Sequence, residues 1–143
     1  MDRPMFRVAM GVFVAIVLSV SGCAGLRNSV EMEQFDRRCR GFVRAVRWGQ
    51  FEEARAYMAP GADAPTPAAL KGVKVSDSRL GPAVMSEDGL RITCPVTFRY
   101  YRTDTMVEHS QTVDQVWRYD PEARAWFLES GFPTFSPAFS PSE

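Results

Sequence analysis

The sequence predicts an α+β domain with N-terminal helices packed on a curved antiparallel sheet of about four strands. Apolar residues recur at helical spacing between residues 30 and 48, and apolar and polar residues alternate in several segments between residues 73 and 130. Helices followed by a run of strands favour an α+β architecture. The chain of 143 residues has room for one domain, which we assign to residues 30–135, followed by a flexible tail over residues 136–143.

The first residues have the pattern of a secretion signal. Arg3 and Arg7 precede an apolar run from Val8 to Val20. This run fits the apolar region of a signal peptide and is shorter than the roughly 20 residues that cross a bilayer. Counting small residues extends the run to Leu26, so an uncleaved membrane anchor is the alternative.

The apolar run ends in Val20-Ser21-Gly22-Cys23, which resembles the lipobox of bacterial lipoproteins. The resemblance implies that residues 1–22 are removed as a signal peptide and that Cys23, the first mature residue, carries diacylglycerol on its thiol and a fatty acid such as palmitate on its amine. Residues 23–29 then form a lipidated tether. Ala24 is not the Asp associated with inner-membrane retention, so the resemblance implies the periplasmic face of the outer membrane. The alternative is an ordinary signal peptide followed by an unmodified cysteine.

Helices are predicted in the first half of the domain. In residues 30–48 an apolar stripe that includes Phe35 and Phe42 lies on one helical face, and Gly49 suits the left-handed residue that closes a helix. A second helix is predicted over residues 51–58. A loop rich in Pro and Gly follows over residues 59–68, with a brief helix near residues 67–72.

Strands are predicted in the second half from alternation of apolar and polar residues. The clearest strand covers residues 90–101, where Pro95 requires a sheet edge or a bulge because proline lacks the backbone N–H. The other predicted strands cover residues 73–85, with a break at Gly81-Pro82, and residues 106–119 and 125–130.

Residues 42–54 contain an apolar stretch, Gly49 and the aromatic Phe51, and a predicted hairpin contains Trp117-Arg118-Tyr119 followed by Trp126-Phe127-Leu128. These stretches resemble the turn between the first two helices and the closing hairpin of the NTF2-like superfamily, which has a cone-shaped α+β fold and includes SnoaL-like proteins. Gln50 stands in place of the usual Asp of that turn. The resemblance implies a helix covering a curved sheet around an interior cone. A cystatin-like or other helix-on-sheet fold is the alternative.

The two remaining cysteines are predicted to face the core. Cys39 shares a helix face with Phe35 and Phe42, and Cys94 alternates with apolar residues of its strand. In an oxidising compartment Cys39 and Cys94 could form a disulfide, and the alternative is two buried thiols that act as small hydrophobic groups. We expect no metal site, because two cysteines with no Cys-x-x-Cys motif do not make one.

The sequence contains few candidate catalytic or ligand-binding residues. His109 is the single histidine, and alternation places it on one strand face with Gln115 and Trp117, which we predict as a pocket of the cone. Some NTF2-like enzymes use such a residue as an acid or base, and the alternative is a solvated strand histidine. The tryptophans, Trp48 among them, are expected in the core, with stacking on a ligand as the alternative.

Four arginines form a row on the first predicted helix. Arg37, Arg40, Arg44 and Arg47 share one helix face, which could meet anionic lipid headgroups or an acidic partner, or could be an ordinary solvated surface. The chain as a whole has a formal net charge of zero, which gives no electrostatic reason to expect a nucleic-acid partner.

The sequence thus favours a membrane-anchored periplasmic lipoprotein with a non-catalytic binding or envelope-assembly role. We expect no enzyme activity and no cofactor, because no catalytic pair, nucleophile turn or phosphate loop is present. The expected partners are the membrane, through its lipid anchor, and an envelope protein or a small apolar ligand. The alternative is a small NTF2-like enzyme that uses His109 as an acid or base.

Overall fold

The computed structural model describes residues 28–135, so the predicted signal peptide, Cys23 and the tail 136–143 lie outside the described residues. Contacts divide the chain into two units, residues 1–34 and residues 35–143. A long helix over residues 28–47 opens the described part. It includes residues 28 and 29, which the composition assigned to the tether.

The further elements are α2 (Phe51–Arg55), α3 (Pro67–Leu70), β1 (Val73–Leu80), β2 (Val84–Met85), β3 (Arg91–Arg102), β4 (Glu108–Asp120) and β5 (Ala125–Leu128).

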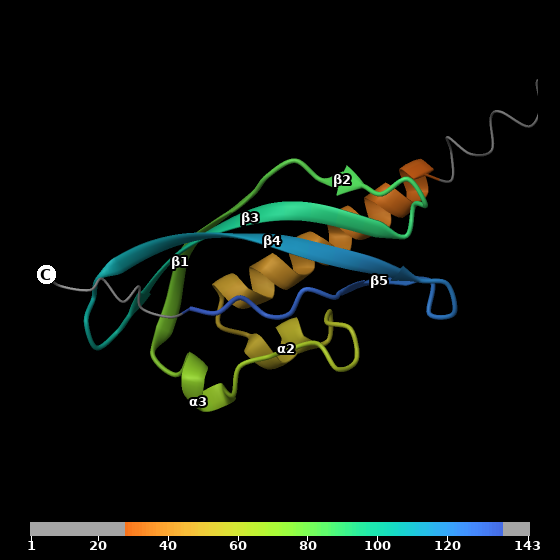
Figure 1. Cartoon of the computed structure of the whole chain (residues 1–143). Helices are drawn as coiled ribbons and strands as arrows, with labels where there is room; N and C mark the ends of the chain where they lie inside the picture. The colour runs from red at the N-terminus through yellow and green to blue at the C-terminus, as the bar shows by residue number, and fades with distance from the viewer. Residues whose placement is uncertain (1–27, 136–143) are drawn as a thin grey trace, which may run out of the picture. The chain divides into compact units, whose positions relative to one another are not determined.

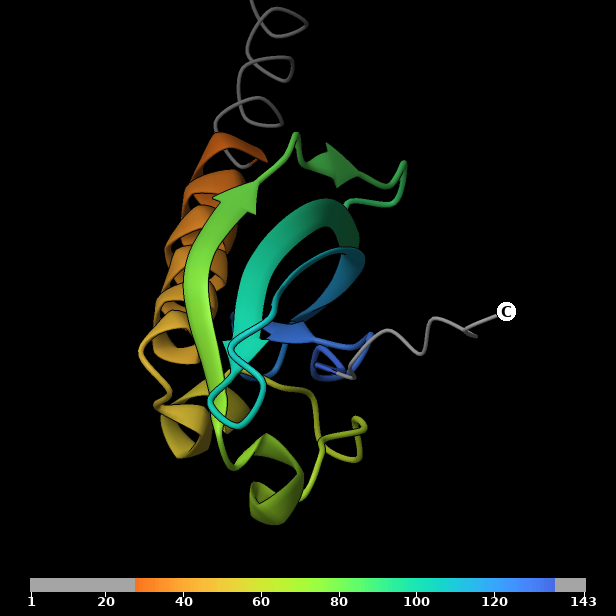
Figure 2. The same cartoon turned by 90° about the vertical axis from the view of Figure 1, so that its left-hand side faces the viewer.

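The predicted α+β class is confirmed. The strands form one antiparallel sheet in the order β1-β3-β4-β5, and the short β2 pairs with β3 beyond the end of β1. The sheet curls, and residues 35–47 of the long helix run along its concave face (Figures 1 and 2). Within residues 28–135 no helix is both long enough and apolar enough to span a membrane.

The core lies between the long helix and this concave face. Phe35 packs edge-to-face on Trp117 and on Trp126, with ring centroids 5.9 and 6.0 Å apart, and Phe42 packs in the same way on Trp117 at 6.0 Å. Such edge-to-face pairs add to the free energy gained from burying the ring area. The buried side chains of β3, namely Ile92, Cys94, Val96, Phe98 and Tyr100, continue the core and confirm the alternation predicted for that strand.

The long helix ends as the sequence predicts. Gly49 has φ of 71° and its N–H donates to the carbonyl oxygen of Val46, while the N–H of Gln50 donates to the carbonyl oxygen of Ala45. These two bonds form the Schellman motif, which needs a left-handed residue at this position. The chain therefore reverses toward α2 at a glycine that has no steric penalty.

Pro95 is accommodated by a break in the neighbouring strand. It lies in β3, a central strand, but β1 ends opposite Val96 and β2 begins opposite Thr93. The carbonyl oxygen of Pro95 accepts the N–H of Gly81, so the side of Pro95 that lacks a donor faces the gap between β1 and β2. The interruption predicted at Gly81-Pro82 and the predicted irregularity at Pro95 are thus one feature.

Two predictions are corrected. Trp48 is 70% exposed and is not a core residue, because it lies just beyond the last helical turn and away from the stripe that ends at Val46. The second helix ends at Arg55 rather than at residue 58. After α2 the chain pairs with the end of β5, where the N–H of Leu128 donates to the carbonyl oxygen of Tyr57 and the N–H of Ala59 donates to that of Leu128.

The gap at Pro95 predicts an intolerance of larger residues at position 81. A Cβ on Gly81 would lie 2.6 Å from Cγ of Pro95 and 3.1 Å from its carbonyl oxygen. Gly81→Ala should lower the free energy of unfolding by about 1–3 kcal/mol through overpacking, as measured by urea denaturation. Pro95→Ala in the same background should recover part of this loss, and strictly additive effects of the two substitutions would contradict the proposed clash.

Candidate functional site

The interior holds a small polar cluster around Gln115. Among the described residues Gln115 is the polar side chain that the core encloses, with 2% of its surface exposed. Its Oε1 accepts Nε1–H of Trp117 at 3.1 Å and the thiol of Cys39 at 3.7 Å. Its Nε2 has no hydrogen-bond partner within residues 28–135. An unpaired buried donor costs free energy, so packing of the surrounding rings must hold the amide in place.

The two cysteines belong to the same cluster. Cys94 lies opposite Gln115 in the pairing of β3 with β4, and Cys39 approaches from the long helix. The structure describes both as free thiols, and their side chains are close enough to share a hydrogen bond. The Cys94 thiol also donates to the carbonyl oxygen of Gly81 at 3.4 Å. The structure thus places the two sulfurs together, and the disulfide stays a prediction.

Burial controls the chemistry of these thiols. Removal from water raises the pKa of Cys39 and also that of Cys94. A raised pKa keeps each sulfur protonated near neutral pH, and a protonated thiol is a poor nucleophile. In the reduced state the two thiols therefore contribute to the packing of the core and are not reactive groups.

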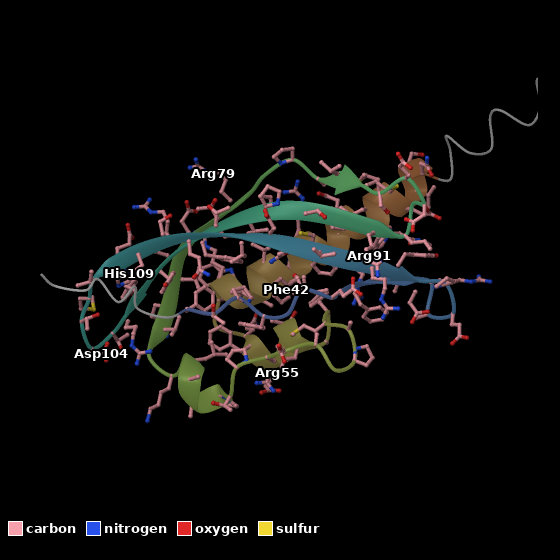
Figure 3. The ribbon with its side chains drawn as sticks, viewed as in Figure 1. Phe42, Arg55, Arg79, Arg91, Asp104 and His109 are labelled. Carbon is pink, nitrogen blue, oxygen red and sulfur yellow. The ribbon has the colours of Figure 1, made fainter. Side chains whose placement is uncertain are left out.

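His109 lies far from this cluster. It pairs with Tyr100 near the other end of β4, and six residues of strand, about 20 Å, separate it from Gln115. Its ring is half-buried against Tyr100, with centroids 5.6 Å apart, and Tyr100 in turn contacts Phe135 at 4.9 Å. Figure 3 shows His109 near the loop that carries Asp104. The structure brings Gln115 and Trp117 together and leaves His109 apart from them.

No acid–base partner is placed at His109 by the described residues. The adjacent Glu108 binds Arg99 and Ser76 instead, and these hydrogen bonds lower the pKa of its carboxyl group. Nor do three or more His, Cys, Asp or Glu side chains gather within residues 28–135 in a way that could hold a metal ion. A general base needs a group that orients or tunes it, and the described surroundings of His109 supply aromatic rings.

Arg38 is an important residue that sequence reasoning missed. Its guanidinium donates to the carbonyl oxygens of Trp126 and Ala56 and lies over the rings of Tyr57 and Phe127, at 4.9 and 5.0 Å from their centroids. Burial lowers the pKa of this guanidinium. A signal was present, because Arg38 falls three residues after Phe35 and four before Phe42, on the edge of the apolar stripe.

The surface of the described residues carries a basic hollow, which we call the arginine groove. It lies between the long helix and β1, has a volume of about 370 Å³, and is lined by Arg40, Val43, Arg44, Arg47, Trp48, Ser78 and Leu80. Three of the four arginines of the predicted row therefore border one recess.

The contacts of Arg38 predict a large effect on stability. Arg38→Met keeps an apolar stem but removes the donors to two carbonyl groups, so the free energy of unfolding should fall by about 2–3 kcal/mol. Arg38→Lys should lose about half as much, since one donor and the cation–π contact remain within reach. Arg44→Met, on the exposed side of the same helix, should change stability by less than about 0.5 kcal/mol. Equal losses for Arg38→Met and Arg44→Met would contradict this role.

The buried thiols predict an alkaline loss of stability in the reduced protein. An unfolded thiol ionises near pH 8.5, whereas the folded thiols, with raised pKa values, stay protonated above that pH. The stabilisation is full below about pH 8.5 and falls above it, by up to about 1.4 kcal/mol per pH unit for each thiol. Denaturation at pH 7 to 10 in a reductant should show this slope, and Cys39→Ala with Cys94→Ala should flatten it. The oxidised protein should lack the slope if the disulfide forms.

Comparison with known proteins assigns neither a family nor a function to this chain. No family model, curated protein or solved structure matches the chain. The features of the described residues that bear on function are an aromatic interior around Gln115, a histidine remote from it, and a basic groove beside an edge strand.

Proposed function

We propose that this protein is a lipid-anchored envelope lipoprotein whose NTF2-like domain binds a partner and does not catalyse a reaction. One observation carries the proposal: large side chains fill the concave interior that an enzyme of this type would keep open. Trp117, Trp126 and Phe42 are each 0% exposed. The interior thus offers packed rings where a substrate would need space.

The finer assignment of the fold rests on two points. A long helix against a curled antiparallel sheet is the arrangement that the NTF2-like family implies, and β4 and β5 form a closing hairpin in which Trp117 and Trp126 face the helix. Two of the residues that suggested the family, Trp117 and Trp126, are thus residues on which the helix packs. This agreement supports the family assignment, which remains part of the proposal.

The anchor rests on Cys23 and its lipobox. Five peptide units connect Cys23 to Asn28, where the described helix is already present, and they reach at most about 18 Å when fully extended. Two or more acyl chains give stable attachment where one chain gives only marginal binding. A lipidated Cys23 would therefore keep the start of the helix near the bilayer, and Ala24 favours the periplasmic face of the outer membrane.

The anchor predicts a specific labelling result. Cells that express the wild-type chain and receive labelled palmitate should incorporate label into the mature protein, and Cys23→Ala should abolish it because no thiol remains to take the first lipid. Cys39→Ala serves as the matched control and should keep full labelling. Incorporation into Cys23→Ala, or an intact mass without added lipid for the wild type, would overturn the anchor.

A further inference from the structure

We propose that the arginine groove binds an extended acidic segment of another protein, which pairs as an added strand with the free edge of β1. This inference deepens the proposed binding role, on which it rests, by naming the surface and the chemistry of the partner. It is carried by a juxtaposition of three features: an edge strand without a neighbour, an apolar floor beside it, and three arginines on the facing helix.

The first feature is the edge of β1. In the sheet order β1 is terminal, and within the described residues its backbone pairs with β3 alone. Figure 2 shows β1 on one side of the sheet with no strand beyond it. An eight-residue edge presents unpaired N–H and C=O groups that can pair with another chain. Recognition by strand addition uses such an edge for affinity and flanking pockets for specificity.

The second feature is the apolar floor and wall of the groove. Leu80 of β1 is half-buried and Val43 of the helix is buried, and both line the recess. Trp48 lies at its end with 70% of its surface exposed. Exposed tryptophan is costly in water and is enriched where partners bind, so an occupant that covers the indole would gain free energy from burial.

The third feature is charge. Within residues 28–135 neither Arg44 nor Arg47 has a carboxylate partner, and the guanidinium of Arg47 lies over the Trp48 ring at 5.8 Å. Arg40 is bound by Asp36 at 2.8 Å. The groove is therefore positive on a chain of zero net charge, and complementarity selects an anionic occupant.

The shape of the site favours an extended peptide over a lipid surface. A membrane meets a protein over a flat face, whereas these arginines border a recess whose other wall is a strand. Alternate residues of an added strand point to the same side. Acidic side chains on that side could reach the arginines while the intervening backbone groups pair with β1.

The test uses mature lipidated protein in phosphatidylcholine nanodiscs, which are zwitterionic and add no net charge. The probe is a fluorescent peptide of about nine residues that alternates glutamate and valine, and its matched control alternates lysine and valine. Fluorescence anisotropy should show saturable binding of the acidic peptide and none of the basic one. N-methylation of the alternate amides that would pair with β1 should reduce affinity at least tenfold, because it removes the donors of the added strand.

Matched variants locate the binding. Arg44→Glu with Arg47→Glu should weaken binding of the acidic peptide at least tenfold. Arg79 (labelled in Figure 3) lies between the groove residues Ser78 and Leu80 and so on the opposite face of β1, and Arg79→Glu should change affinity less than twofold. Thermal unfolding confirms that the variants are folded. Absent binding, unchanged affinity after N-methylation, or equal effects of Arg79→Glu and the paired substitution would each overturn the proposal.

The remaining outcomes separate this proposal from its alternatives. If the paired substitution leaves peptide affinity unchanged and instead weakens binding to phosphatidylglycerol vesicles, the arginines face lipid and the proposal is wrong. Intact mass reports the lipid on the same sample. Loss of peptide binding with the lipid present overturns the groove assignment alone, whereas absence of the lipid overturns the anchor and leaves the peptide result standing.

Discussion

The packing of the long helix on the curled sheet is the interaction on which the rest of the structure depends. A curled antiparallel sheet has one apolar face that must be covered, and here Phe35 and Phe42 cover it by packing on Trp117 and Trp126. This packing fills the interior, positions Arg38 against the carbonyl oxygen of Trp126, and brings Cys39 to Cys94. It also sets the distance between the helix and β1 that leaves the arginine groove open.

The packing of the helix on the sheet also separates the interior of the domain from the groove on its surface. Aromatic rings occupy the interior, and Oε1 of Gln115 accepts the indole N–H of Trp117 and the thiol of Cys39 there. His109 lies against Tyr100 at the far end of β4, with the two rings tilted. The recognition that we propose therefore uses the outside, where β1, the exposed indole of Trp48 and three guanidinium groups border one groove.

Local sequence predicted several elements because their causes are local. Gly49 closes the helix through its own left-handed conformation, and alternation in β3 gives its buried face directly. Other features depended on distant partners. The chain after Arg55 leaves the helix to pair with Leu128, and Pro95 sits in a central strand because β1 stops opposite it. Sequence spacing alone does not show either partner. The pattern therefore predicts the second helix too long, and it places an irregularity at Pro95 without showing that β1 stops opposite it.

The sequence by itself determined the α+β class, the order of the elements and the lipobox that predicts the anchor. The spacing of apolar residues, the residues that form turns and a short motif are all properties of residues that are neighbours in the chain. Tertiary structure decided which of the aligned residues meet. His109, Gln115 and Trp117 share one strand face, yet the helix reaches Gln115 and Trp117 and leaves His109 apart. The row of arginines became a groove only through its placement opposite β1. Periodicity assigns a residue to a face, whereas the packing of one element on another decides what that face contacts.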